Sequence, residues 1–172
     1  MASNLLLIAS IAFCIYLAHC YYQDVQISQA DLQPRNLPIS RAAESFVVGK
    51  KKDKSVFGGT VHIFQFEDEY IEIVGMICNL KPNSTHALHV HKFGEVHPNC
   101  SETFGDFNPY GQKHGSHKND RIEDRHLGDL GNIKANNMGV ARFQLRDYNL
   151  RIDDNDIFSI LGRSIAVGAF RR

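Results

Sequence analysis

The stretch "TVHIFQFEDEYIEIVGMIC", residues 60–78, decides the fold class of this chain. It holds two apolar runs, 60–66 and 69–78, that are rich in β-branched and aromatic residues and are separated by the acidic turn "EDE". Such runs favour strands, because branched and aromatic side chains pack well on a pleated surface. The stretch therefore predicts two neighbouring strands joined by a tight turn.

Apolar runs of the same kind recur along the chain, with Gly, Asn and Pro between them. No stretch shows the spacing of a long amphipathic helix. Many short strands separated by turn residues predict an all-β, antiparallel sandwich or barrel. The further predicted strands are 44–49, 86–92, 131–135, 139–145 and 162–170.

One long segment, residues 93–130, has no strand or helix periodicity. A loop of this length inside a compact domain is usually functional or disordered. Of the nine histidines in the chain, seven lie between His86 and His126, within or beside this loop. The clustering favours a functional loop.

The histidines fall into two groups with the residue types of metal sites. His89 and His91 are two apart on a predicted strand, so both project to the same face, where imidazoles bind zinc, copper, iron or nickel. His114, His126 and Asp129 form the second group, and two imidazoles with a carboxylate are zinc ligand types. The alternative is a polar loop whose His and Asp side chains only cap turns.

The chain of 172 residues is the length of one domain. Its 19 basic and 19 acidic residues balance, which argues against a nucleic-acid partner or a membrane surface bound by bulk charge. Residues 1–20 lack charged side chains, and the apolar run 5–18 is short for a membrane span. We expect residues 1–20 to be a signal peptide cleaved before Tyr21, and the protein to be secreted. A retained membrane anchor is the alternative.

Secretion would leave two cysteines, Cys78 and Cys100, as candidates for a disulfide. Asn83 and Asn99 head Asn-x-Ser/Thr sequons and are candidate glycosylation sites of a glycoprotein. Residues 21–42 are polar, contain two prolines and are expected to form an N-terminal extension before a β-barrel domain over 43–172.

Several motifs together resemble the copper–zinc superoxide dismutase family, in order and spacing, from Ala43 to Val167. The resemblance implies a Greek-key β-barrel or sandwich of eight strands with a long metal-binding loop. The motifs are "HALHVHKFGE" (86–95), "FNPYGQKHG" (107–115), "RHLGDLGN" (125–132), "GVARFQL" (139–145) and "LGRSIAV" (161–167).

The resemblance also implies the metal ligands. Four histidines hold copper in the family, and only His89 and His91 remain here, because Asp106 and Gly168 occupy the other two positions. A carboxylate suits Cu(I) poorly. The zinc positions match Asp106, His114, His126 and Asp129, four protein donors of types that zinc accepts. We therefore expect zinc to be retained and the copper site to be degraded, with no catalytic residue assigned.

In the family the chain continues beyond the seventh strand. The continuation carries an active-site arginine, the cysteine that pairs with the position of Cys100, and an eighth strand. We expect this strand to be missing here and the barrel to have an open edge, which a homodimer or a protein partner would cover. "YYQDVQISQ" (21–29) alternates, with Val25 and Ile27 on one face, and is a hypothetical filler of that edge. A disordered tail is the alternative.

The predicted function is that of a secreted superoxide dismutase-like protein with little or no dismutase activity and a binding or structural role. One alternative is an active extracellular dismutase with a remodelled copper site, for which superoxide is the substrate and oxygen and hydrogen peroxide are the products. A second alternative is a non-catalytic copper-binding protein. An incomplete C-terminus would explain Gly168 but not Asp106, which lies inside well-matched sequence.

Overall fold

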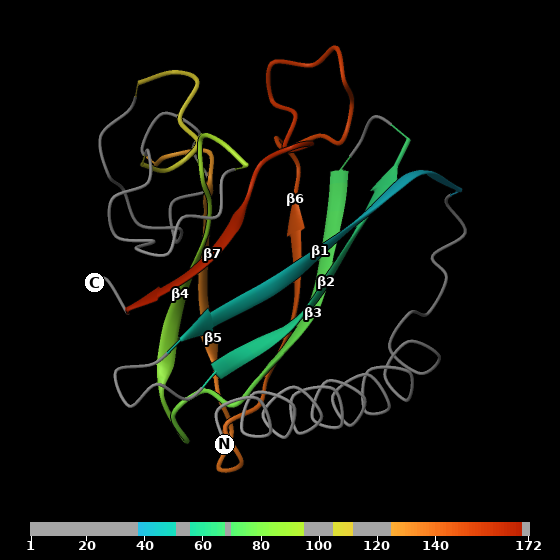
Figure 1. Ribbon diagram of the computed structural model, residues 1–172. Coiled ribbons are helices and arrows are strands. Elements are labelled where there is room, and N and C mark those ends of the chain that lie inside the picture. The colour runs from blue at the N-terminus through green and yellow to red at the C-terminus, as the bar shows by residue number, and fades with distance from the viewer. Residues whose placement is uncertain (1–37, 51–55, 68–69, 95–104, 112–124, 170–172) are drawn as a thin grey trace, which may run out of the picture.

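A computed structural model describes residues 38–50, 56–67, 70–94, 105–111 and 125–169. Within these ranges there are seven strands and no helix, so no helix there is long and apolar enough to cross a membrane. The strands, drawn in Figure 1, are β1 (Ile39–Lys50), β2 (Val56–Phe66), β3 (Tyr70–Cys78), β4 (Thr85–Val90), β5 (Asp129–Lys134), β6 (Ala141–Asp147) and β7 (Ile165–Ala169).

The strands form two antiparallel sheets. One sheet has the order β1-β2-β3-β6, and the other has the order β5-β4-β7. The prediction of an all-β sandwich with antiparallel strands is therefore confirmed. The residue pair Phe66 and Tyr70 closes the β2–β3 hairpin, as the opening stretch predicted.

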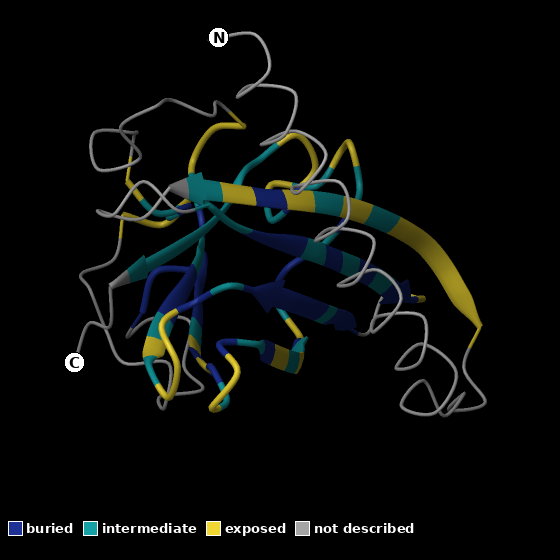
Figure 2. Cartoon of the chain, turned by 60° about the horizontal axis from the view of Figure 1, so that its bottom comes forward, coloured by how far each residue is buried: buried dark blue, intermediate teal, exposed yellow. Residues whose placement is uncertain are grey.

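The predicted strands are present, but their ends differ from the sequence pattern. The first begins at Ile39, ahead of the predicted start at Glu44, and so takes in the end of the expected N-terminal extension. After Ile39, the next residues, 40–43, are polar or small and are mostly exposed, which is why the apolar pattern missed them. Figure 2 shows exposed positions repeating along β1, in contrast to the buried centre of the molecule.

The core lies between the two sheets. β3 contributes most, with Ile71, Ile73 and Ile77 fully buried. From the opposite sheet, Leu88 and Val90 of β4 join the same apolar cluster. Because strand side chains alternate, the burial of these two residues sends His89 to the other face of β4.

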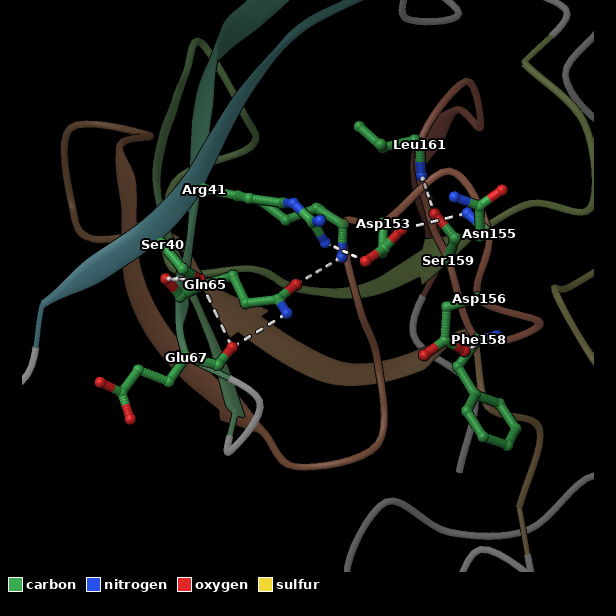
Figure 3. Close-up of polar contacts among 11 residues, drawn as sticks. Ser40, Arg41, Gln65, Glu67, Asp153, Asn155, Asp156, Phe158, Ser159 and Leu161 are labelled. Carbon is green, nitrogen blue, oxygen red and sulfur yellow. Dashed lines mark hydrogen bonds and ion pairs between the residues drawn. The ribbon is translucent and has the colours of Figure 1, made fainter.

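The segment between β6 and β7 is fastened to the first sheet (Figure 3). The Gln65 amide, which is 1% exposed, accepts a hydrogen bond from the Ile152 backbone N–H at 2.8 Å and donates one to the Glu67 carbonyl at 3.0 Å. Arg41 of β1 forms an ion pair with Asp153 in the same segment. These contacts hold the residues after β6 across the end of β1 and β2.

Candidate metal centre

The candidate centre is built around the end of β4, which lies between β5 and β7. Three backbone hydrogen bonds link Val90 at the end of β4, Phe107 and Gly128 to one another. The Phe107 N–H donates to the Val90 carbonyl at 2.8 Å, and the Val90 N–H donates to the Gly128 carbonyl at 2.8 Å. The Gly128 N–H donates in turn to the Phe107 carbonyl at 2.7 Å. This triangle brings Asp106 and the segment 126–129 to His89.

Gly128 makes the triangle possible. A Cβ at this position would lie 2.4 Å from the Val90 carbonyl oxygen and 2.9 Å from the Phe107 nitrogen. Any larger residue would push these backbones apart, so the glycine in "HLGD" is required by close approach rather than by an unusual backbone angle.

Two carboxylates and two imidazoles meet there. His89 Nδ1 lies 2.9 Å from Asp129 Oδ1 and 3.6 Å from Asp106 Oδ1. The other oxygen of Asp106, Oδ2, lies 3.2 Å from His126 Nδ1. The Asp106 carboxylate therefore lies between two imidazoles, and the side chains concerned are largely buried.

These distances fit a divalent cation of the zinc type. The donor atoms of His89, Asp106 and Asp129 all lie within 4.8 Å of one another. Zinc binds nitrogen and oxygen at about 2.0–2.2 Å, which places tetrahedral ligands roughly 3.3 Å apart. His126 adjoins the group through the second oxygen of Asp106. Without a metal, the same side chains form a compact network of hydrogen bonds and ion pairs.

His91 lies next to the cluster through the backbone, as the bridge partner of Asp106. Burial lowers the pKa of His91, the charge of Asp106 opposes this, and that of His89 adds to it. The net direction favours the neutral imidazole, which is the form that binds metals.

Among the described residues, β7 adds no side chain to the group of candidate metal ligands. Ala166 pairs with His89, and Gly168 pairs with Ala87. A Cβ built at Gly168 would lie more than 4 Å from every other described residue that is not its chain neighbour.

Arg125 is a residue of the site that sequence reasoning missed. Its guanidinium is buried, with NH2 donating to Asp147 Oδ2 at 2.7 Å and NH1 donating to the Asp129 carbonyl at 2.8 Å. Asp147 also accepts hydrogen bonds from the Asn149 and Leu150 backbones. Arg125 thereby fastens the segment that carries His126 and Asp129 to the end of β6. The only signal in the sequence was a charged residue directly beside a candidate ligand.

The predicted site residues are thus distributed as follows. Asp106, His126 and Asp129 lie together, and His89, which the resemblance assigned to copper, joins them. His114, Asn99 and Cys100 lie outside the described residues, so their predicted roles stay predictions. Among the other candidates, Cys78 is buried at the end of β3 and Asn83 is exposed in the turn before β4.

Comparison with protein families gives one match over most of the barrel. The model of copper/zinc superoxide dismutase (SODC) matches residues 57–171. This range contains both sheets except β1, and all the candidate ligands.

Individual relatives include two kinds of protein. The copper chaperone for superoxide dismutase of Rattus norvegicus is 38% identical over 109 residues, which are 63% of this chain and 36% of the chaperone. The Cu-Zn superoxide dismutase of Candida albicans is 38% identical over 112 residues, which are 64% of this chain and 70% of that protein. The matched part therefore spans about a third of the length of the chaperone.

Among solved structures, the crystal structure of the clock protein EA4 is similar, with a TM-score of 0.60 and 26% sequence identity. The match covers 75% of this chain and 74% of that one.

Proposed function

The chain belongs to the copper/zinc superoxide dismutase family, and from this membership we propose that it is a secreted, dismutase-like zinc protein with little or no dismutase activity. Its role would be binding or structural. The proposal rests on the nature of the donors around β4 rather than on the family alone.

The observation that carries the proposal is the position of Asp106 between His89 and His126. A carboxylate is an ordinary zinc ligand and a poor partner for Cu(I). It also lacks the two-nitrogen ring with which an imidazole can exchange a metal for a proton. Zinc held here by Asp106, His126 and Asp129, with His114 or His89 as the fourth ligand, would supply stability to the loop.

The β7 side supports the same conclusion. Gly168 offers no donor beside His89 and His91, so these residues could supply only two imidazoles to a copper ion. We therefore assign copper at most a partial set of ligands. Dismutation requires a metal that cycles between oxidation states, and zinc does not do so.

A glycosylation sequon and a pair of cysteines outside the site are consistent with secretion. Asn83 is exposed and its sequon is accessible in the turn before β4, as a glycosylation site requires. In this proposal Cys78 pairs with Cys100, and closing the loop between them would stabilise the fold by about 3 kcal/mol on the chain-entropy estimate.

The test is the metal content of the purified chain, measured by mass spectrometry, with a superoxide assay after copper loading. We expect about one zinc per chain, substoichiometric copper and negligible turnover. Asp106→Ala and His126→Ala should lose the zinc, while Asp154→Ala, an exposed aspartate away from the site, should keep it.

The alternatives predict different outcomes. Stoichiometric copper with fast turnover would show an active dismutase with a remodelled site and would overturn the proposal. Copper retained without turnover, and lost on substitution of His89 or His91, would identify a copper-binding protein instead.

A further inference from the structure

The seam between β1 and β7 is one of two places in the described part of the chain, the other being β5 and β6, where strands of the two sheets come into contact without pairing. There, β1 is hydrogen-bonded only to β2, and β7 only to β4. The two strands come near each other without pairing. In Figure 1 they run side by side, with their arrowheads pointing the same way. Each therefore has one strand edge directed toward the seam.

The core is incompletely covered along this seam. Ala43 of β1 and Ile165 and Val167 of β7 pack against the apolar cluster but stay only partly buried. A cavity of about 200 Å³ lies between the two strands. Four apolar residues line it, Ile63, Val90, Ile152 and Ile160, and the polar residues Glu44, Ser45 and Arg163 also contribute to its wall. A dry, apolar cavity of about 150 Å³ can hold a group as large as benzene, so this one has room for a branched aliphatic side chain.

The rim of the cavity is fixed rather than loose. Leu161 lines it and is 39% exposed, although it is a large apolar residue. Figure 3 shows the Leu161 N–H donating to the Ser159 hydroxyl, in the segment held to β1 and β2 by Asp153 and its neighbours. Arg163, also on the rim, stacks over the Phe107 ring at 3.9 Å and donates to the Ser159 carbonyl.

We propose that residues 21–29 of this chain dock into the β1–β7 seam as an added strand, with Val25 and Ile27 directed into the cavity. The cleft requires an extended segment that can pair with a strand edge through its backbone and place every second side chain against the apolar residues of the cavity. "YYQDVQISQ" has this alternation, with Asp24, Gln26 and Ser28 on the opposite face. The inference is independent of which metal is bound.

The position of the segment in the chain supports docking within one molecule. Residues 30–38 lie between it and β1, and they contain Pro34 and Pro38, the second directly before Ile39. Proline has no N–H to continue a strand ladder and favours a turn. A chain that reverses there runs antiparallel to β1, and, because β1 and β7 point the same way, antiparallel to β7 as well. The added strand can therefore form the commoner antiparallel pairing on both sides.

The test is hydrogen exchange of the purified chain, followed residue by residue over amides 23–28. We expect slow exchange that does not depend on chain concentration. Rapid exchange at every concentration would overturn the proposal. Protection that appears only as concentration rises, together with a dimer in sedimentation, would show that a second copy fills the seam and would equally overturn it.

Two pairs of variants make the test specific. Val25→Asp with Ile27→Asp should lower protection of amides 23–28 by at least about tenfold, because carboxylates would be placed against the apolar residues of the cavity. Gln26→Asp with Ser28→Asp adds the same charge on the opposite face and should leave protection unchanged within about twofold. An equal loss in both would contradict the assigned face.

A change on the receiving side checks the same contact without altering the segment. Leu161→Asp, at the rim, should also reduce protection of amides 23–28. Ile157→Asp lies in the same segment after β6, is 68% exposed and does not line the cavity, so it serves as the matched control. Circular dichroism of each variant shows whether the barrel itself remains folded. Unchanged protection in a folded Leu161→Asp chain would overturn the assigned cavity.

Discussion

The two sides of β4 differ in how closely other segments of the chain pack against this strand, which carries His89. On the β5 side, Gly128 allows three backbones to touch, and Arg125 fastens the ligand-bearing segment to Asp147. On the β7 side, a Cβ at Gly168 would contact none of the described residues. Gly128 is required because a Cβ there would overlap neighbouring backbone atoms, whereas no such overlap with the described residues arises at Gly168.

Under the proposed function, this difference would account for a zinc site on one side of β4 and an incomplete set of copper ligands on the other. The β5 side is part of the folded core, because its buried arginine and close backbones also support the fold. On the β7 side a Cβ at Gly168 would contact none of the described residues, so a change of side chain there should have little effect on stability. Four predictions test this contrast, from the largest expected effect to the smallest.

The largest effect should come from Arg125→Ala. Removing one partner of a buried ion pair leaves the other charge uncompensated and typically costs about 3–5 kcal/mol. Urea denaturation measures the loss. Lys134→Ala, on an exposed position of β5, should change stability by less than about 0.5 kcal/mol. A loss below about 1 kcal/mol for Arg125→Ala would mean that the β5 side is less firmly built than the contacts indicate.

The two glycines provide the most direct comparison. Gly128→Ala should destabilise the chain by about 1–3 kcal/mol, since its Cβ would overlap the Val90 carbonyl. Gly168→Ala should be neutral or stabilising by up to about 1 kcal/mol, because alanine loses less conformational entropy in a strand than glycine. Thermal and urea unfolding of both variants check this. Similar losses would remove the contrast between the two sides.

Adding imidazole ligands at positions 106 and 168 should increase the affinity for copper. Asp106→His combined with Gly168→His would add two imidazoles beside His89 and His91, and the open space at Gly168 accepts the new side chain. We expect copper affinity to rise at least about tenfold, or about 1.4 kcal/mol, in a chelator competition. Asp106→His with Gly168→Ala is the control, and it should gain less. An equal gain would show that position 168 does not face the copper ligands.

The smallest effect should be a pH dependence from His86, which lies on β4 away from the metal cluster. Burial lowers the pKa of His86, and a hydrogen bond to the Gly168 backbone partly offsets this. The unfolded chain therefore binds the proton more readily than the folded one. Stability from this residue is complete above the ordinary histidine pKa of 6.5 and is lost as pH falls through the lowered value.

Unfolding of the metal-free chain at pH 7.5 and 5.5 measures this contribution. His86→Gln should flatten the fall in stability between these pH values, because glutamine keeps polar contacts but does not titrate there. A fall of unchanged size would assign the pH dependence to other groups.

The strands follow the sequence prediction more closely than the grouping of the candidate metal ligands does. Strands and turns followed from short-range patterns, since alternation and turn residues act over a few positions. Within β4, Leu88 and Val90 belong to the core, which places His89 on the opposite face, as the alternation predicted. The pairing of His89 with Asp129 was not predicted, because these residues are 40 positions apart and the resemblance assigned them to different metals.

By itself, the sequence determined the fold class and the family, because each depends on residue identity and local spacing. Only the tertiary structure decided which side chains share a centre and where described strands of the two sheets meet without pairing. Asp106 reaches His89 and His126 through backbone contacts that exist only once Gly128 closes on Val90 and Phe107. Arg125 has a role only because Asp147, 22 residues further along the chain, lies beside it in the fold.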